Sequence, residues 1–465
     1  MVTLAARGVD GVMTAPWPTE QQAATSTVAL AGKLVSERIG LMSAVSERRA
    51  SGDDASVVDY VAWLDRRTRG RWSSADTTGG SSHTRAEAVA RAVGESVERY
   101  CLGQHQPSAL RWAPWTDVDT GVHGAASYTF FLDEQYTREG FSFQRPDEGT
   151  SIAWVRGRSA TTGAHVYAPA SLVYVPYTHR AGEPALSHQT SVGTSCARSV
   201  ATATLRATLE LVERDAMTIC WEAQLPFPPL DARFVEEVAG GTRRWLVGTR
   251  APRLELQAFD LTTDLDIPVV LAVARSRSSV GPVSWGVAAD LGLWGATEKA
   301  IVEAIAMWRS TVHLSASADT STAAPRAGED STLEHQALRY ARSGEHGHFD
   351  FLLGSSPRAR AMARRADAPT AYTETSDHRG CLTACLSGLR ARGHEVVVFD
   401  LTQPEADEVG LVVIRAVAPT LVRQTLSRYC RHLGNPRFRE VPRWLGVATR
   451  ARDPETLLDD FRPFP

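Results

Sequence analysis

Two acidic segments contain the residues whose types and spacing are best suited to chemistry. The pattern E-x-x-E-R occurs once as Glu95, Glu98 and Arg99 and again as Glu210, Glu213 and Arg214. In an α-helix, residues three apart lie on one face, so the two carboxylates of each segment converge from adjacent turns. Carboxylates spaced in this way can share a Mg²⁺ ion, which prefers hard oxygen ligands together with substrate phosphates. Two such helices facing each other predict a site for magnesium and a nucleotide, with an arginine beside each pair.

The same spacing has a plainer explanation. Glu95 and Arg99 also stand at positions i and i+4, where an ion pair can simply decorate a solvated surface. The second segment argues against that explanation, because leucine, valine and alanine surround its acids on nearly all sides. A buried carboxylate without a cation or a basic partner is costly. We therefore expect Glu210 and Glu213 to be enclosed and to need a bound ion or a paired arginine.

Long helices and buried strands must position these residues. Hydrophobic periodicity predicts helices at about 27–48, 85–102, 198–221, 296–314 and 381–393. Apolar and β-branched runs predict strands at 171–177, 254–262, 267–275, 394–402 and 410–417. Strands followed by helices dominate, so we expect a mixed α/β or α+β architecture.

We expect two parts in the chain. Residues 1–70 form an N-terminal segment that is partly helical, and residues 71–465 form the domain that carries both acidic helices. The stretch 315–332 lacks apolar periodicity and has the composition of an exposed loop. The candidate chemistry therefore lies in the second part.

Composition excludes several classes of protein. The chain has 465 residues, 43% hydrophobic and 22% charged, which is typical of a globular protein. A net charge of −3 leaves no cationic field for nucleic acid or an anionic membrane, and no apolar run is long enough to span a bilayer. The 6 cysteines include no C-x-x-C pair, and Cys381 and Cys385 are expected to be buried apolar residues rather than metal ligands. We expect a cytoplasmic protein.

The acidic segments belong to a longer series of motifs. In chain order these are EAVARAVGESVERY, TSVGTSCARSVATATLRATLELVERDA, FDLTTDLDIPVV, VVVFDLT, IRAVAPTL, HLGNPRF and the terminal RPFP. Together they resemble the YcaO family from about residue 71 to residue 465. The resemblance implies a YcaO-type fold, with repeated strand–helix units around a central site for ATP and Mg²⁺. It also implies an ATP-dependent enzyme that acts on a backbone amide of a ribosomally made peptide.

The resemblance assigns roles to individual residues. Magnesium ligands are Glu95, Glu98, Glu210 and Glu213; residues that bind the nucleotide are Arg99, Arg214, Glu303 and Arg309. The α-carboxylate of Pro465 is a candidate general base, because a proline-rich terminus reaches the active site in ring-forming members of the family. The chain departs from the family at Arg91, where a serine is usual, and at Ala306, where a glutamine is expected. Arg309 is about one residue out of register.

The function that the resemblance implies is cyclodehydration. Cys, Ser or Thr residues of a precursor peptide would be converted to thiazolines or oxazolines by phosphorylation of the backbone amide, as in thiopeptide-like antibiotic biosynthesis. A separate ubiquitin-activating-like protein would bind the leader peptide, and a homodimer is compatible with the sequence. Two alternatives stay open: a thioamide- or amidine-forming enzyme, and a non-catalytic scaffold subunit suggested by Arg91 and Ala306.

Overall fold

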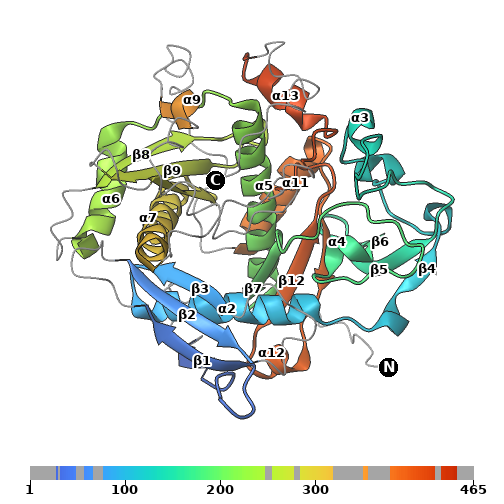
Figure 1. The fold of residues 1–465 in the computed structure, drawn as a ribbon, viewed down its shortest axis with the longest axis horizontal. Coiled ribbons are helices and arrows are strands. Elements are labelled where there is room, and N and C mark those ends of the chain that lie inside the picture. The colour runs from blue at the N-terminus through green and yellow to red at the C-terminus, as the bar shows by residue number, and fades with distance from the viewer. Residues whose placement is uncertain are drawn as a thin grey trace.

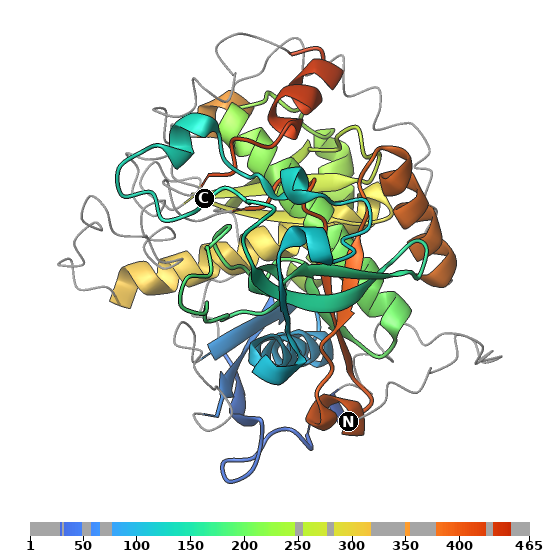
Figure 2. The same cartoon turned by 90° about the vertical axis from the view of Figure 1, so that its right-hand side faces the viewer.

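The computed structural model describes residues 28–29, 32–48, 57–65, 77–246, 254–276, 283–317, 349–353, 378–424 and 431–447. Within them, three antiparallel sheets surround three long helices (Figures 1 and 2). Most of the predicted loop at 315–332, Cys430 and the terminal Pro465 lie outside the described residues.

The first sheet joins the two parts predicted from the sequence. Its order is β1 (Met42–Glu47), β2 (Val58–Leu64) and β3 (Thr77–Ser82). The helix predicted at 27–48 is wrong over residues 42–47, where exposure alternates from residue to residue as in a strand. Strands from both sides of residue 70 therefore pair in one sheet.

Helix α2 (Arg85–Gly103) covers this sheet and carries the first acidic pair. It begins after Thr84, whose hydroxyl accepts a hydrogen bond from the Glu87 N–H at 3.2 Å. The helix lies so close to β3 that a Cβ on Gly80 would stand 2.2 Å from the Ala88 oxygen and the Ala92 nitrogen. The helix predicted at 85–102 is confirmed, and a glycine sets its distance from the sheet.

The second unit is a larger sheet with helix α5 (Val200–Ala223) packed on β7 and β12. The strands run in the order β4-β5-β11-β12-β7, with β6 beside β5; they are β4 (Arg111–Ala113), β5 (Ile152–Ser159), β6 (His165–Pro169), β7 (Thr194–Ala197), β11 (Val397–Asp400) and β12 (Val412–Val417). The strand predicted at 171–177 is wrong at its start, since α4 (Ala170–Val173) is a helical turn. All four of its residues are buried, so its apolar run reflects burial and not strand geometry.

The third unit repeats the plan of the first. Helix α7 (Leu293–Ser317) packs on β10 (Val283–Ala289) and β9 (Val269–Ser276), and β8 (Leu254–Asp260) completes the sheet. A Cβ on Gly286 would stand 2.3 Å from the Ala300 oxygen, as at Gly80 under α2. Strand β10 is not among the strands predicted from the sequence.

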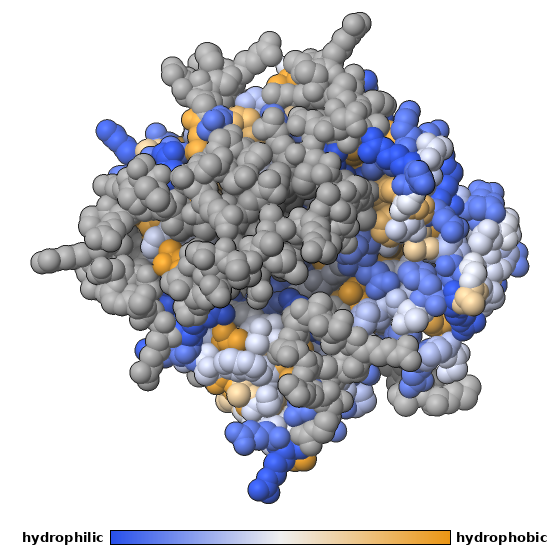
Figure 3. Space-filling view, in the orientation of Figure 1, coloured by the Kyte–Doolittle hydropathy of each residue, from blue (hydrophilic) through white to orange (hydrophobic). Residues whose placement is uncertain are grey.

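Further helices lie around these units: α3 (Asp133–Tyr136), α6 (Ala232–Leu246), α9 (Asp350–Leu353), α11 (His378–Ala391), α12 (Pro404–Glu408) and α13 (Arg437–Trp444). Cys381 and Cys385 of α11 are buried and free of disulfides. On the face in Figure 3, hydrophobic spots on the described residues are small and separated by hydrophilic surface. None of the described helices is long and apolar enough to cross a membrane.

The three units meet in a ring. Helix α2 contacts β7 of the second unit, α5 contacts β10 of the third, and α7 contacts β3 of the first. Figure 1 shows the three helices converging near the middle of the molecule. The mixed α/β prediction is confirmed, and the ring brings the two acidic segments to one place.

Candidate active site

The first acidic pair bridges two units through backbone hydrogen bonds. On α2, Glu95 accepts a hydrogen bond from the Gly79 N–H at 3.0 Å, on the strand beneath its own helix. Glu98 instead accepts from the Cys196 N–H at 2.6 Å, on β7 of the next unit. Glu95 is therefore held by the sheet of its own unit, whereas Glu98 reaches a strand of the next unit. We call the place where a helix of one unit meets a strand of the next a junction.

The second pair repeats this arrangement one unit further on. On α5, Glu210 accepts from the Gly193 N–H at 2.9 Å, just before β7, and Glu213 accepts from the Ala289 N–H at 3.1 Å on β10. Gly193 has a φ of +87°, which a residue with a side chain rarely adopts. The glycine therefore lets the chain turn so that its N–H meets Glu210.

The third helix keeps half of the pattern. Glu303 of α7 accepts from the Val287 N–H at 3.1 Å, on its own strand β10. The residue three positions on, which would cross to β3, is Ala306. The ring thus carries acidic residues at two of its junctions and a methyl group at the third.

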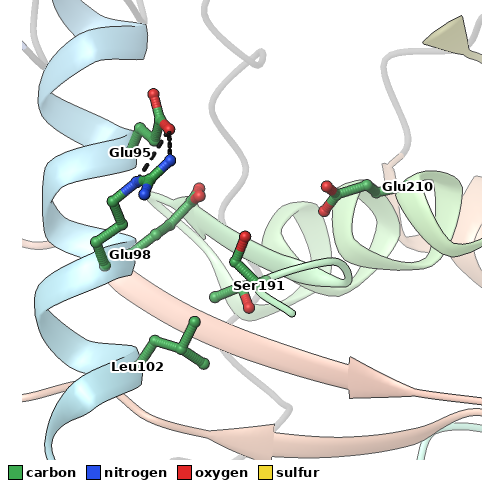
Figure 4. A pocket seen from close by; sticks show the side chains of 7 residues that line it. Glu95, Glu98, Leu102, Ser191 and Glu210 are labelled. Atoms are coloured by element: carbon green, nitrogen blue, oxygen red, sulfur yellow. Dashed lines mark hydrogen bonds and ion pairs between the residues drawn. The ribbon is translucent and has the colours of Figure 1, made fainter. Parts of the chain in front are cut away.

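A cavity of about 300 Å³ opens where α2 and α5 face each other. Its lining comes from α2, α5 and the segment before β7: Glu95, Glu98, Arg99, Leu102, Ser191, Thr194 and Glu210. Figure 4 shows Glu95 and Glu98 projecting from α2 and Glu210 pointing toward them from α5, with Ser191 between. The predicted meeting of the two acidic segments is therefore present: Glu95, Glu98 and Glu210 line one polar pocket, and Glu213 is not among its lining residues.

Burial raises the pKa values of these carboxyl groups. It raises the pKa of Glu98 to about 8, helped by the neighbouring Glu210 and Glu95 and opposed by the Cys196 N–H. It also raises the pKa of Glu213 to about 8, where Arg214 opposes the rise and Glu303 adds to it. The pKa values of Glu210 and Glu303 are raised for the same first reason. Such a cluster gains from any cation that neutralises it.

The arginines predicted beside the cluster have different surroundings. Arg99 makes two hydrogen bonds to the Glu95 Oε1, at 3.1 and 2.6 Å, and lines the cavity. Arg214 lies 3.1 Å from the Glu213 Oε1 and donates to Gln424 at 3.1 Å. Arg309 is buried and donates to the backbone carbonyls of residues 48 and 57, so its predicted contact with nucleotide gains no support from this placement.

The donor set suits Mg²⁺ chemically. Glu98, Glu210 and Glu303 each accept from an N–H with one oxygen and keep the other available for a hard cation. Both oxygens of the other two predicted ligands, Glu95 and Glu213, are engaged by a backbone N–H and an arginine. Among the described residues, no three His, Cys, Asp or Glu side chains gather closely enough to hold a metal ion as they stand. Coordination would therefore require these side chains to turn, and the metal roles stay proposals.

The family is decided by the extent of the sequence match. The family model described as YcaO cyclodehydratase, ATP- and Mg²⁺-binding, matches residues 79–422, which is more than half of the chain. The chain belongs to the YcaO family. The recognition made from the motifs is confirmed, as are ATP and Mg²⁺ as the cofactors. An uncharacterised protein from Methanothermobacter thermautotrophicus is 25% identical over 346 residues, covering 74% of this chain and 80% of its own.

Solved structures support the YcaO fold. A heterocyclase in complex with substrate and cofactor matches with a TM-score of 0.73 and 20% identity over 95% of this chain, which spans only 58% of that protein. YcaO from Methanopyrus kandleri, bound with AMPPCP and Mg²⁺, matches with a TM-score of 0.58 and 16% identity, over 88% of this chain and 93% of its own. The E. coli microcin synthetase McbBCD complex with pro-MccB17 bound matches with a TM-score of 0.61 and 14% identity, over 85% of this chain and 94% of that one.

Sequence reasoning missed the backbone partners of the glutamates. Gly79 and Gly193 are not among the predicted site residues, yet their N–H groups donate to Glu95 and Glu210. It also missed Arg415, a fully buried side chain on β12 that donates to the carbonyls of Thr190 and Val192 behind the cavity wall. The spacing of 16 or 17 residues from each N–H donor to the glutamate of its own helix was the available signal.

Proposed function

We propose that this YcaO protein is an ATP-dependent cyclodehydratase that forms azoline rings in a ribosomally made peptide, in a thiopeptide-like pathway. A Cys thiol, or a Ser or Thr hydroxyl, attacks the preceding carbonyl carbon, and the carbonyl oxygen leaves as phosphate, so the peptide loses one water per ring. The observation that carries the proposal is the shared pocket of Glu95, Glu98 and Glu210, which two distant helices build. The family's ATP and Mg²⁺ chemistry fits that pocket.

The chain's own residues have distinct tasks in this proposal. Glu95, Glu98, Glu210 and Glu213 would hold the magnesium ions, and the backbone N–H groups that donate to them orient each carboxylate. Bound Mg²⁺–ATP supplies the phosphoryl group and spreads its charge.

The basic residues and Glu303 complete the site. Arg99, now paired with Glu95, and Arg214, now paired with Glu213, would bind phosphate oxygens of the nucleotide. Glu303 adds negative charge from α7 beside Glu213. These roles follow from the family motif and the positions of the side chains.

Pro465 remains the candidate base. Its α-carboxylate would take the proton from the attacking thiol or hydroxyl. It lies outside the described residues, so the proposal rests on the RPFP sequence and the family pattern alone. Removing Pro463 to Pro465 should abolish ring formation, whereas a thioamide-forming enzyme that uses an external nucleophile should retain activity.

A separate leader-binding protein completes the proposal. The heterocyclase with the highest structural similarity reported above is much longer than this chain, and the microcin synthetase acts as a complex of subunits with its peptide bound. We therefore expect the precursor peptide to be presented by a ubiquitin-activating-like partner.

Mass spectrometry tests the function directly. The protein is incubated with a Cys/Ser-rich precursor peptide, its partner and Mg²⁺–ATP. A loss of the mass of one water per ring, dependent on ATP, is the expected result. An unchanged peptide mass, with the partner shown to bind the leader, would contradict ring formation.

One observation favours the scaffold alternative. Arg309 is committed to backbone carbonyls and Ala306 offers no polar group, so α7 contributes only Glu303 to the site. A scaffold need not bind nucleotide. Isothermal titration with Mg²⁺–ATP separates the two functions, because a catalytic subunit binds it and a scaffold without a nucleotide site does not.

A further inference from the structure

Arg423 differs from every other buried arginine in the described part of the chain. Five arginines are buried there: Arg309, Arg415, Arg423, Arg431 and Arg437. Two of them, Arg431 and Arg437, form ion pairs with buried carboxylates, and two others, Arg309 and Arg415, donate to several backbone carbonyls. Among the described residues, Arg423 has neither kind of partner.

The contacts of Arg423 are weak for a buried cation. Its guanidinium reaches the Ser187 Oγ at 3.5 Å and the Thr190 Oγ1 at 3.4 Å, and it lies 5.8 Å from the centre of the Phe130 ring. Hydrogen bonds from N–H to oxygen are normally about 2.9–3.0 Å long, and a guanidinium has five N–H donors to satisfy. Burial lowers the pKa of Arg423 to about 10, so it is still a cation at neutral pH. A buried charge left in this state calls for an anion.

Arg423 lies directly behind the nucleotide cavity. Thr190, which it contacts, precedes Ser191 in the cavity wall, and its neighbour Gln424 accepts a hydrogen bond from Arg214 at 3.1 Å. The buried Arg415 donates to the Thr190 carbonyl at 2.8 Å and adds a second positive charge close by. The next residues of the chain, TLSRYC at 425–430, contain no acid.

The Ser187 hydroxyl already donates to the His188 carbonyl at 3.1 Å and lies 3.1 Å from the His432 Nε2, which leaves the Thr190 hydroxyl beside Arg423. We propose that Arg423 and the Thr190 hydroxyl form a subsite for a phosphate group beside the nucleotide cavity. A phosphate presents oxygens to the guanidinium and to the Thr190 hydroxyl at once, and arginine binds it with two parallel hydrogen bonds. The role of this subsite rests on the proposed ATP-dependent function. The phosphate is then either the terminal phosphoryl group of ATP or the inorganic phosphate released with each ring.

Titration of inorganic phosphate tests the subsite on the full chain, without nucleotide, magnesium or peptide. Arg423→Met should weaken phosphate binding at least tenfold. Arg390→Met, which removes one exposed positive charge on α11, is the matched control and should bind phosphate as the wild type does. The affinity for Mg²⁺–ATP is measured on the same variants.

The two sources of phosphate give different results. Weaker phosphate binding with unchanged Mg²⁺–ATP affinity assigns the subsite to the released product, and Mg²⁺–ATP affinity at least fivefold weaker assigns it to the phosphoryl group. If Arg423→Met changes neither affinity, the subsite does not exist.

A second variant guards against misfolding. Thr190→Val keeps the shape of the side chain and the buried arginine but removes one hydroxyl, so it should weaken the same affinity about threefold while its thermal unfolding stays close to that of the wild type. Equal phosphate binding by Thr190→Val and the wild type would count against the subsite. Glu98→Gln should retain phosphate binding even where it loses ATP turnover, so failure of the proposed function and failure of the subsite are separable.

Discussion

The junctions between the three helices follow one plan but end in different chemistry. At the α2–α5 and α5–α7 junctions, Glu98 and Glu213 cross to backbone N–H groups of the next unit. At the α7–α2 junction the corresponding residue is Ala306. The contacts there are instead that of the His83 Nε2 with the Glu298 carboxylate, 3.4 Å apart, and those of the buried Arg309. The α2–α5 and α5–α7 junctions therefore contain buried carboxylates, whereas contacts at the α7–α2 junction attach the N-terminal sheet to α7.

This difference teaches where the chemistry can occur. The same strand–helix contact supports both uses, because the backbone N–H of a strand donates to a glutamate wherever the helix provides one. Negative charge builds up only where two helices provide it together, as at Glu98 with Glu210 and at Glu213 with Glu303. We therefore expect changes at the acidic junctions to alter ATP use and changes at the third junction to alter stability.

The largest expected effect comes from adding a methyl group where a helix lies directly against a strand. Gly80→Ala and Gly286→Ala each place a Cβ within 2.3 Å of helix backbone, so the free energy of unfolding should fall by about 2–3 kcal/mol. Gly79→Ala is the control, because its Cβ would meet nothing within 4 Å. Denaturant unfolding measures all three, and equal stability of the Gly79 and Gly80 variants would refute the close packing.

Removal of single charges at the acidic junctions should come next. Glu98→Gln and Glu213→Gln keep a side-chain oxygen for the backbone N–H but lose the charge that attracts Mg²⁺, so ATP turnover should fall at least about tenfold. Steady-state phosphate release measures this. Glu236→Gln, an exposed change on α6, is the control and should not alter ATP turnover. Unchanged turnover in Glu98→Gln and Glu213→Gln would mean that the acidic pairs have no role in binding Mg²⁺–ATP.

The pH dependence of stability offers a third test. The folded protein raises the pKa of Glu98 and Glu213 from 4.5 to about 8, so it binds more protons than the unfolded chain between those values. The stability contribution present below pH 4.5 is therefore lost as the pH rises through about 8. Thermal unfolding without nucleotide should show a falling midpoint over this range, and Glu98→Gln should flatten the fall. An equally steep fall in that variant would mean that Glu98 ionises normally.

The smallest effect is expected at the third junction. The Ser81 N–H lies on the same edge of β3 as that of Gly79, because alternate residues of a strand direct their N–H groups to one side. Ala306→Gln would supply an acceptor there, as Glu213 does for Ala289, and should raise the free energy of unfolding by about 1 kcal/mol. Ala306→Leu, without an acceptor, is the control, and a gain equal to that of Ala306→Gln would attribute the effect to apolar contact alone.

The sequence predicted the parts of the site that repeat at helical spacing. The helices around Glu95, Glu210 and Glu303 are long and strongly patterned, so their positions and facing acids were recognisable. What could not be predicted depends on contacts between distant segments: β1 resembled a helix in its composition, α4 resembled a strand because it is buried, and Arg423 became notable only once its surroundings were known.

The pairing of β1 and β2 with β3 matters for any shortened form of this protein. A chain that began at residue 71 would leave β3 with one row of N–H and C=O groups open to solvent, and open strand edges promote association between molecules. It would also lose the support of the strand whose Gly79 holds Glu95. Soluble, active truncations should therefore start before Met42.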